Sequence, residues 1–256
     1  MRGWLAAVAV AASMAVAGPA AAAPGPLFDP GQDVDYQLGG VRDDLPDDVG
    51  IVVRDRKAAP LAGRYNVCYV NGFQTQPDER RFWREHHWRL VLKDDGRPVV
   101  DSAWGEWVLD IRTREKRRAL ARIVGGWTDR CADDGFDAVE YDNLDSFSRS
   151  HRLVTRRHAK AFARLLVGRA HDAGLPVGQK NWAEWDGSTI GFDFAVAEEC
   201  GRWRECRRYA ASYGDHVLAI EYRRRDFRRT CTGYGERWPV VLRDLALTPR
   251  GVHRWC

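Results

Sequence analysis

Three carboxylates stand close together at the end of an apolar run in the segment GFDAVEYDNLDSF, residues 135–147. The run begins with small and apolar residues and ends with Glu140, Asp142 and Asp145. Isolated carboxylates are costly to bury, so a strand that ends in three of them needs an explanation. Side chains alternate along a strand, and Glu140 and Asp142 are therefore expected to point the same way, with Glu140 one layer deeper. The spacing places Asp145 on the loop above them.

A second acid from another strand would complete a catalytic pair, and Glu198 is the best placed candidate because it ends the apolar run 192–198. Two carboxylates that face each other across a pocket can hydrolyse a glycosidic bond. One attacks or stabilises the oxocarbenium-like centre, and the other protonates the leaving oxygen. Burial and like charge separate the pKa values of such a pair, which lets one acid stay protonated near neutral pH. We predict that Asp142 and Glu198 form this pair.

The pattern of apolar residues predicts the elements that hold these acids. Short apolar runs bounded by turns cover residues 34–38, 50–53, 65–70, 137–142, 176–180, 192–198, 217–221 and 239–242, with 107–111 as a ninth. Residues 113–130 and 155–173 repeat apolar side chains at helical spacing, and Thr113 and Thr155 are predicted to cap these helices. This alternation predicts an α/β fold, a single-domain (β/α)8 TIM barrel. An open doubly wound sheet is the alternative, although no G-x-G-x-x-G motif follows an early strand.

Polar side chains gather where the predicted strands end. In a parallel barrel all strand C-termini share one rim, and this rim carries the active site. We therefore expect residues far apart in the sequence to form one acidic pocket. The predicted substrate-binding residues around the catalytic pair are Tyr36, Gln37, Tyr69, Asn71, Asp110, Glu140, Asp145, Lys180, Asn181, Glu221, Arg243 and Asp244. Any one of these carboxylates can instead be an ordinary helix cap, but several of them in register favour a site.

The N-terminal residues have the composition of an export signal. Arg2 precedes an apolar stretch at 4–17, and small residues at 20–23 form a cleavage site of the A-x-A type. We predict a signal peptide at residues 1–23, a mature domain at 24–256, and a secreted protein without a membrane segment after cleavage. The alternative is an uncleaved N-terminal anchor.

Six cysteines in an exported chain predict a disulfide-stabilised fold. Many connectivities are open to six cysteines. Our hypothesis pairs the sequence neighbours Cys200 with Cys206 and Cys231 with Cys256, which leaves Cys68 with Cys131.

The charge pattern and the histidines argue against other classes of site. The net charge is +4, and the excess arginines lie on helix-like segments, which is more typical of a solvated surface than of a nucleic-acid interface. None of the seven histidines ends a predicted strand, which argues against a His-based triad or a His-rich metal site. A hard-cation site of Glu140, Asp142 and Glu198 stays an alternative. We expect no cofactor, no metal and no nucleic-acid partner.

Tryptophan supplies a second kind of candidate sugar contact. Trp104, Trp107, Trp182 and Trp185 lie near predicted strand ends, and aromatic faces suit sugar rings. Core packing explains most tryptophans, so we expect only one or two of these to contact sugar.

Several blocks of the sequence together resemble glycoside hydrolase family 114, the endo-α-1,4-polygalactosaminidase-like barrels. The blocks are DYQLGG (35–40), YNVCYVNGFQTQP (65–77), GFDAVEYDNLDSF (135–147), GQKN (178–181), GFDFAVAEEC (191–200), LAIEY (218–222) and VVLRD (240–244). They follow the order of the family and cover nearly the whole predicted mature chain. The resemblance implies a (β/α)8 barrel that cuts α-1,4-linked galactosamine polymers internally without a metal. It also implies that Asp142 and Glu198 are the catalytic residues.

Three features beside the acids depart from the family pattern and bear on substrate choice. Tyr141 stands where proline is common, Ala197 stands where asparagine often precedes the catalytic glutamate, and the segment 182–190 is unusual.

The acidic rim itself would attract the ammonium groups of deacetylated galactosamine. We therefore expect a monomeric endo-glycosidase that acts on a cationic amino-sugar polysaccharide. The alternatives are a non-catalytic secreted binder of cationic glycans and a metal-dependent phosphodiesterase barrel that uses Glu140 and Asp142.

Overall fold

The computed structural model describes residues 23–256. The predicted signal peptide at 1–23 therefore lies, apart from its last residue, outside the described residues. Every helix within 23–256 is too short or too polar to cross a membrane.

A nine-stranded sheet forms the centre of the fold, in the order β1-β2-β3-β8-β9-β10-β11-β12-β13. The strands are β1 (Asp33–Gln37), β2 (Val49–Asp55), β3 (Tyr65–Asn71), β8 (Ala138–Asp142), β9 (Val177–Lys180), β10 (Phe194–Glu198), β11 (Val217–Glu221), β12 (Val240–Arg243) and β13 (His253–Trp255). Neighbours from β1 to β12 pair in parallel, and β13 pairs antiparallel to β12. The parallel order confirms the predicted barrel, and the bounds of the first eight predicted strands lie within two residues of the observed ones.

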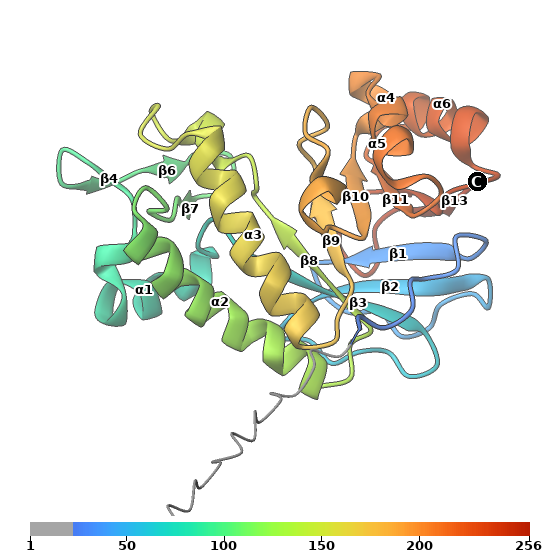
Figure 1. The fold of residues 1–256 in the computed structure, drawn as a ribbon. Coiled ribbons are helices and arrows are strands. Elements are labelled where there is room, and N and C mark those ends of the chain that lie inside the picture. The colour runs from blue at the N-terminus through green and yellow to red at the C-terminus, as the bar shows by residue number, and fades with distance from the viewer. Residues whose placement is uncertain (1–22) are drawn as a thin grey trace, which may run out of the picture.

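Two long helices pack side by side against the sheet (Figure 1). These are α2 (Arg114–Asp133) and α3 (Arg156–Asp172), and both predicted caps are present. Thr113 Oγ1 accepts a hydrogen bond from the Lys116 amide at 3.2 Å, and Thr155 Oγ1 accepts one from His158 at 3.3 Å. The faces that carry the apolar repeat are buried, as the spacing predicts.

The remaining helices are short. They are α1 (Arg80–His86), α4 (Cys200–Trp203), α5 (Cys206–Tyr213) and α6 (Arg224–Tyr234), with 3-10 turns η1 (Pro77–Glu79), η2 (Trp88–Leu90), η3 (Ser146–Arg149) and η4 (Gly187–Ile190). In the described chain, loops rather than helices follow β1 and β2, at residues 38–48 and 56–64. Both loops contain proline, at Pro46 and Pro60, which disfavours a helix. The ring of helices is therefore incomplete on this side of the barrel (Figure 1).

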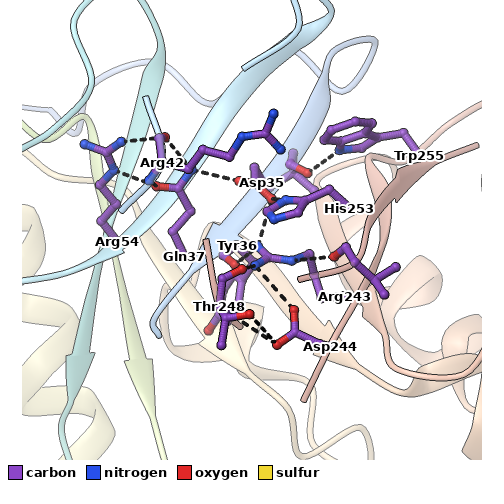
Figure 2. A network of polar contacts seen from close by, with 12 residues as sticks. Asp35, Tyr36, Gln37, Arg42, Arg54, Arg243, Asp244, Thr248, His253 and Trp255 are labelled. Carbon is purple, nitrogen blue, oxygen red and sulfur yellow. Dashed lines mark hydrogen bonds and ion pairs between the residues drawn. The ribbon is translucent and has the colours of Figure 1, made fainter. Parts of the chain in front are cut away.

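A buried polar network joins the first strand of the sheet to its last two (Figure 2). Arg243 Nη1 donates to Asp35 Oδ1 at 2.8 Å, and His253 Nδ1 lies 2.9 Å from the same oxygen. Trp255 Nε1 donates to the carbonyl of Val34 at 2.8 Å. Side chains of β12 and β13 thus hold β1 in place where the barrel closes.

The ninth predicted strand, residues 107–111, is not a strand of the barrel. An insertion between β3 and α2 contains two small antiparallel pairs, formed by β4 (Lys93–Asp94), β5 (Arg97–Pro98), β6 (Val100–Asp101) and β7 (Glu106–Trp107). Val108 and Leu109 make single bridges to Gln74 and Val91, and their side chains are buried. Burial inside the insertion explains the apolar run, because an apolar pattern does not say which sheet a segment joins.

All three disulfides match the hypothesis from the sequence. Cys68 on β3 is linked to Cys131 on α2, Cys200 is linked to Cys206, and Cys231 on α6 is linked to the C-terminal Cys256.

Candidate active site

The alternation along β8 separates its acids from its packing residues. Ala138 belongs to the apolar cluster inside the barrel, and Glu140 and Asp142 share its side of the strand. Val139 and Tyr141 belong to the cluster between the sheet and the helices. Tyr141 Oη lies 2.7 Å from Thr128 Oγ1 of α2. The departure from the family pattern at Tyr141 therefore faces the helices and not the site.

A buried lysine on β9 connects the acids of β8 and β10. Lys180 Nζ lies 3.4 Å from Asp142 Oδ2 and 3.2 Å from Glu198 Oε2. It also donates to Tyr36 Oη at 2.9 Å, and Tyr36 in turn donates to Glu140 Oε1 at 2.5 Å. Because both acid oxygens contact the same nitrogen, they are no more than about 7 Å apart. One ammonium on β9 thus lies between the two predicted catalytic carboxylates, which come from the strands on either side of it.

Hydrogen bonds orient the carboxylate of Asp142. Its Oδ2 accepts from the hydroxyl of Tyr69 at 2.9 Å, and its Oδ1 accepts from the amide of Asn143 at 2.6 Å.

Glu198 is oriented in the same manner by its own partners. Asn181 Nδ2 donates to Glu198 Oε2 at 3.0 Å, and the hydroxyl of Tyr222 donates to Oε1. The Glu198 amide donates to Asn181 Oδ1 at 2.9 Å, so the asparagine holds both the backbone and the side chain of the acid. Both carboxylates are therefore fixed before a substrate binds.

Burial and charge set the protonation of the deeper layer. Burial raises the pKa of Glu140 to about 8, although Lys180 and the hydrogen bond from Tyr36 act in the opposite direction. Burial disfavours the charged form of Lys180, but the carboxylates of Asp142, Glu198 and Glu140 outweigh this effect and raise its pKa. At neutral pH the lysine is therefore charged and Glu140 is largely protonated.

A cavity of about 410 Å³ opens above this cluster. Its lining includes Asp55, Tyr69, Asp101, Trp104, Glu106, Asp142, Asn143, Asp145, Arg149, Lys180, Asn181, Glu198, Tyr222 and Leu245. A second hollow of about 750 Å³ adjoins it and shares Asp145, Asn181, Glu198 and Tyr222 with it. Together the two hollows form a cleft with the predicted catalytic pair in one arm and Glu198 at the junction.

Six predicted site residues line the cavity, namely Tyr69, Asp142, Asp145, Lys180, Asn181 and Glu198. Tyr36 and Glu140 lie in the barrel interior below Lys180. Asn71 supports the wall, because its Oδ1 accepts from the Asn143 side chain at 3.1 Å.

Glu221 and Asp110 lie away from the cavity. Glu221 follows Ile220, which points into the barrel, so Glu221 points outward and accepts from the Gly201 amide at 2.7 Å and from Thr230 Oγ1 at 2.8 Å. Asp110 belongs to the insertion and pairs with Arg112 at 2.8 Å and with Lys116 at 2.5 Å.

Gln37, Arg243 and Asp244 belong to the closure of the barrel. Gln37 Oε1 accepts from Arg54 at 3.0 Å, and Arg243 pairs with Asp35 (Figure 2). Asp244 Oδ2 accepts from the amide and the hydroxyl of Thr248, both at 3.1 Å.

Several cavity residues were not among the predicted site residues, and Glu106 and Tyr222 are two of them. Glu106 comes from the insertion, and its Oε2 accepts from Asn143 Nδ2 at 3.2 Å. Burial raises the pKa of Glu106 to about 7, and the charges of Asp142 and Asp101 add to this effect while Asn71 opposes it. No pattern in the sequence placed Glu106 at the rim. Side-chain alternation could have indicated Tyr222, because it is two residues after Ile220, which faces the barrel interior.

Comparison with models of known protein families identifies the family of this chain. The model of glycoside-hydrolase family GH114 matches residues 15–256. The chain belongs to glycoside hydrolase family GH114. No curated protein sequence matches it.

Solved structures share the fold of this GH114 chain at low sequence identity. The Aspergillus fumigatus Ega3 complex with galactosamine is 21% identical, with a TM-score of 0.70, over 93% of this chain and 99% of that one. The glycoside hydrolase domain of PelA from Pseudomonas aeruginosa is 15% identical, with a TM-score of 0.60, over 86% and 97% of the two chains. The likeness therefore extends over the whole barrel of this glycoside hydrolase.

Proposed function

We propose that this GH114 enzyme is a secreted endo-glycosidase that cleaves α-1,4-linked, galactosamine-containing polysaccharide by a two-carboxylate mechanism. The observation that carries the proposal is the contact of Lys180 Nζ with both Asp142 and Glu198. It limits the separation of the two carboxylate oxygens to about 7 Å, which is compatible with the roughly 5–9.5 Å that glycosidases use. The galactosamine bound in the Ega3 structure supports the choice of sugar.

The proposed roles follow from the position of each acid. Asp142 acts as nucleophile or base, and Glu198 acts as general acid and base at the leaving oxygen. Lys180 stabilises the carboxylate of Asp142 before reaction, and it compensates the negative charge that Glu198 gains when it gives its proton to the leaving oxygen. Tyr69 and Tyr222 keep the two carboxylates in place as charge develops on the sugar.

Acidic side chains in the cavity support a cationic substrate. Asp55 and Glu106 line the cavity with the catalytic acids, and Asp101 and Asp145 add two more carboxylates that share Arg149 as a partner. A cavity of this composition attracts the ammonium group of a deacetylated amino sugar.

The test is hydrolysis of acetylated and deacetylated galactosamine and glucosamine polymers, measured as new reducing ends. We expect Asp142→Asn and Glu198→Gln each to lower kcat by about 10²–10⁴, the range that general acid–base groups contribute. Glu85→Gln, on the exposed face of α1, is the matched control, and thermal unfolding should show that all three variants fold. Near wild-type rates for both active-site variants would refute the proposed roles.

Two alternatives give different results in the same assay. A non-catalytic binder of cationic glycans would retain the polymer but release no reducing ends. A metal-dependent phosphodiesterase would lose activity with a chelator and would cleave phosphodiesters instead of polygalactosamine. The ammonium of Lys180 favours the glycosidase, because it already occupies the position between the carboxylates where a metal would bind.

Export and assembly are tested on the purified protein. Mass spectrometry of protein from the culture medium should find an N-terminus at residue 24, and a full-length chain would support an uncleaved anchor instead. Light scattering should give the mass of a monomer.

A further inference from the structure

The two arms of the cleft differ in the charge of their side chains. We call the 410 Å³ cavity, with Asp55, Glu106 and Asp142, the acidic arm. We call the 750 Å³ hollow the arginine arm, because Arg156, Arg204, Arg207 and Arg208 line it. Glu198 belongs to both arms and marks their junction. A glycan that runs through the whole cleft therefore meets two different electrostatic environments.

Three of the four arginines are free to act on a ligand. Arg208 pairs with Glu184 at 3.3 Å, but Arg156, Arg204 and Arg207 make no ion pair with the described residues. The guanidinium of Arg156 lies 5.4 Å from the centre of the Phe147 ring.

The carboxylates of the arginine arm are mostly engaged. Glu184 pairs with Arg208, and Glu199 accepts two hydrogen bonds of 2.8 Å from Arg202. Asp145 and Glu198, which also line this arm, pair with Arg149 at 2.7 Å and with Lys180 at 3.2 Å. Glu205 pairs with no cation among residues 23–256, and burial raises its pKa. Excess positive charge is therefore available beyond Glu198.

A fixed aromatic side chain also lies in this arm. Trp203 is 60% exposed and is the last residue of α4, within the short segment that the Cys200–Cys206 disulfide closes. The Arg202 guanidinium, which Glu199 holds, lies 4.6 Å from the centre of the Trp203 ring. An exposed tryptophan that is held in this manner offers a sugar ring a stacking surface at little cost in conformational entropy.

We propose that the arginine arm binds the leaving-group side of the glycan and selects N-acetylated sugars over deacetylated ones, with one sugar against Trp203. The inference rests on the proposed function. If Glu198 protonates the leaving oxygen, the leaving-group sugars lie on its side of the cleft. Like charges at close range disfavour binding, so an ammonium group is rejected beside Arg156 and Arg207 whereas a neutral acetamide is accepted. The enzyme then cuts where a galactosamine is followed, toward the reducing end, by an N-acetylated sugar.

The experiment is digestion of partially N-acetylated polygalactosamine, followed by mass spectrometric sequencing of the product ends. Each cut creates a new reducing end from the acidic arm and a new non-reducing end from the arginine arm. We expect the new non-reducing ends to be N-acetylated at least about tenfold more often than random cleavage predicts, a bias that one like-charge contact can supply.

Charge reversal tests which residues cause the bias. Arg156 and Arg207 are in the first turns of α3 and α5, where a glutamate is compatible with the helix. We expect Arg156→Glu/Arg207→Glu to abolish or invert the bias while still cleaving the polymer. Arg228→Glu on α6, outside the residues that line the arm, should keep the wild-type bias. If the double variant does not fold, each single variant should reduce the bias.

The outcomes separate the two proposals. Random or deacetylated non-reducing ends, or a bias that survives charge reversal, would overturn the selectivity of the arginine arm while the hydrolase assignment stands. If no galactosamine polymer is cleaved at all, the proposed function fails, and this inference fails with it.

Discussion

Lys180 Nζ lies 3.2 Å from Glu198 Oε2, which makes a buried ammonium the direct neighbour of the proposed general acid. The contact follows from the sheet register. Lys180 of β9 pairs with Val196 of β10, and Glu198 is the next inward-facing residue of β10. The same ammonium reaches Asp142 on β8, so one side chain contacts both acids.

Lys180→Met should impair both stability and activity. Without the ammonium, the carboxylates of Asp142 and Glu198 lose the cation that they share. We expect the acidic limb of the kcat/KM profile to move to higher pH. The free energy of unfolding should fall by about 3–5 kcal/mol, as for a buried ion pair that loses one partner. Lys57→Met, which breaks a more exposed pair on the surface, is the control, and an unchanged pH profile in Lys180→Met would contradict the role of the lysine.

Glu140 should make stability depend on pH. Its pKa is about 8 in the folded protein and 4.5 in its ordinary state, so the folded protein binds a proton in this interval that the unfolded chain releases. The stabilisation is therefore complete below pH 4.5 and disappears as the pH rises toward about 8. Urea unfolding across this interval should show a smaller loss of stability in Glu140→Gln than in the wild type. If the free energy of unfolding changed equally with pH in the two proteins, Glu140 would have an ordinary pKa in the folded state, and the prediction would be wrong.

Glu106 should affect catalysis only when it is ionised. Because its pKa is about 7, it adds a negative charge to the acidic arm above that pH and is neutral below it. We expect Glu106→Gln to lower kcat/KM for a deacetylated polymer above about pH 7 and to leave the value unchanged at lower pH. An N-acetylated oligomer, which lacks the ammonium group, is the control substrate. A loss of the same size at every pH, or with both substrates, would indicate a structural defect instead.

The two disulfides on either side of β8 in sequence should differ in their effects. Cys68–Cys131 closes a segment of 63 residues and Cys200–Cys206 closes one of 6. Loop entropy predicts that replacement by serine costs about 4 kcal/mol for the first and about 2 kcal/mol for the second. Urea unfolding measures both values. Only loss of Cys200–Cys206 should also raise KM for long substrates, because that bridge holds the segment that carries Trp203. Equal KM values for the two disulfide variants would argue against a contact between Trp203 and the glycan.

The sequence alone was sufficient for the barrel, the disulfide pairing and the position of the acid pair on β8 and β10. Apolar periodicity and turn residues mark each strand end, and a parallel barrel brings all of these ends to one rim. The alternation of β8 also predicts that Glu140 lies below Asp142, as observed. These features can be read from the sequence because they depend on apolar periodicity, on side-chain alternation and on the rule that parallel strand ends share one rim.

The insertion and the direction of strand-end side chains were decided by the tertiary structure. Glu106 reaches the acidic arm because residues between β3 and α2 fold over the barrel mouth, and no local pattern encodes that contact. Glu221 turns away and Tyr222 turns in, because the side that faces the barrel depends on how β11 is packed. Arg243 likewise contacts Asp35 of β1 and not the cavity, because of the way in which β12 packs beside β1. A sequence pattern gives the spacing of charged groups, but their partners, burial and pKa values arise only when distant segments pack together.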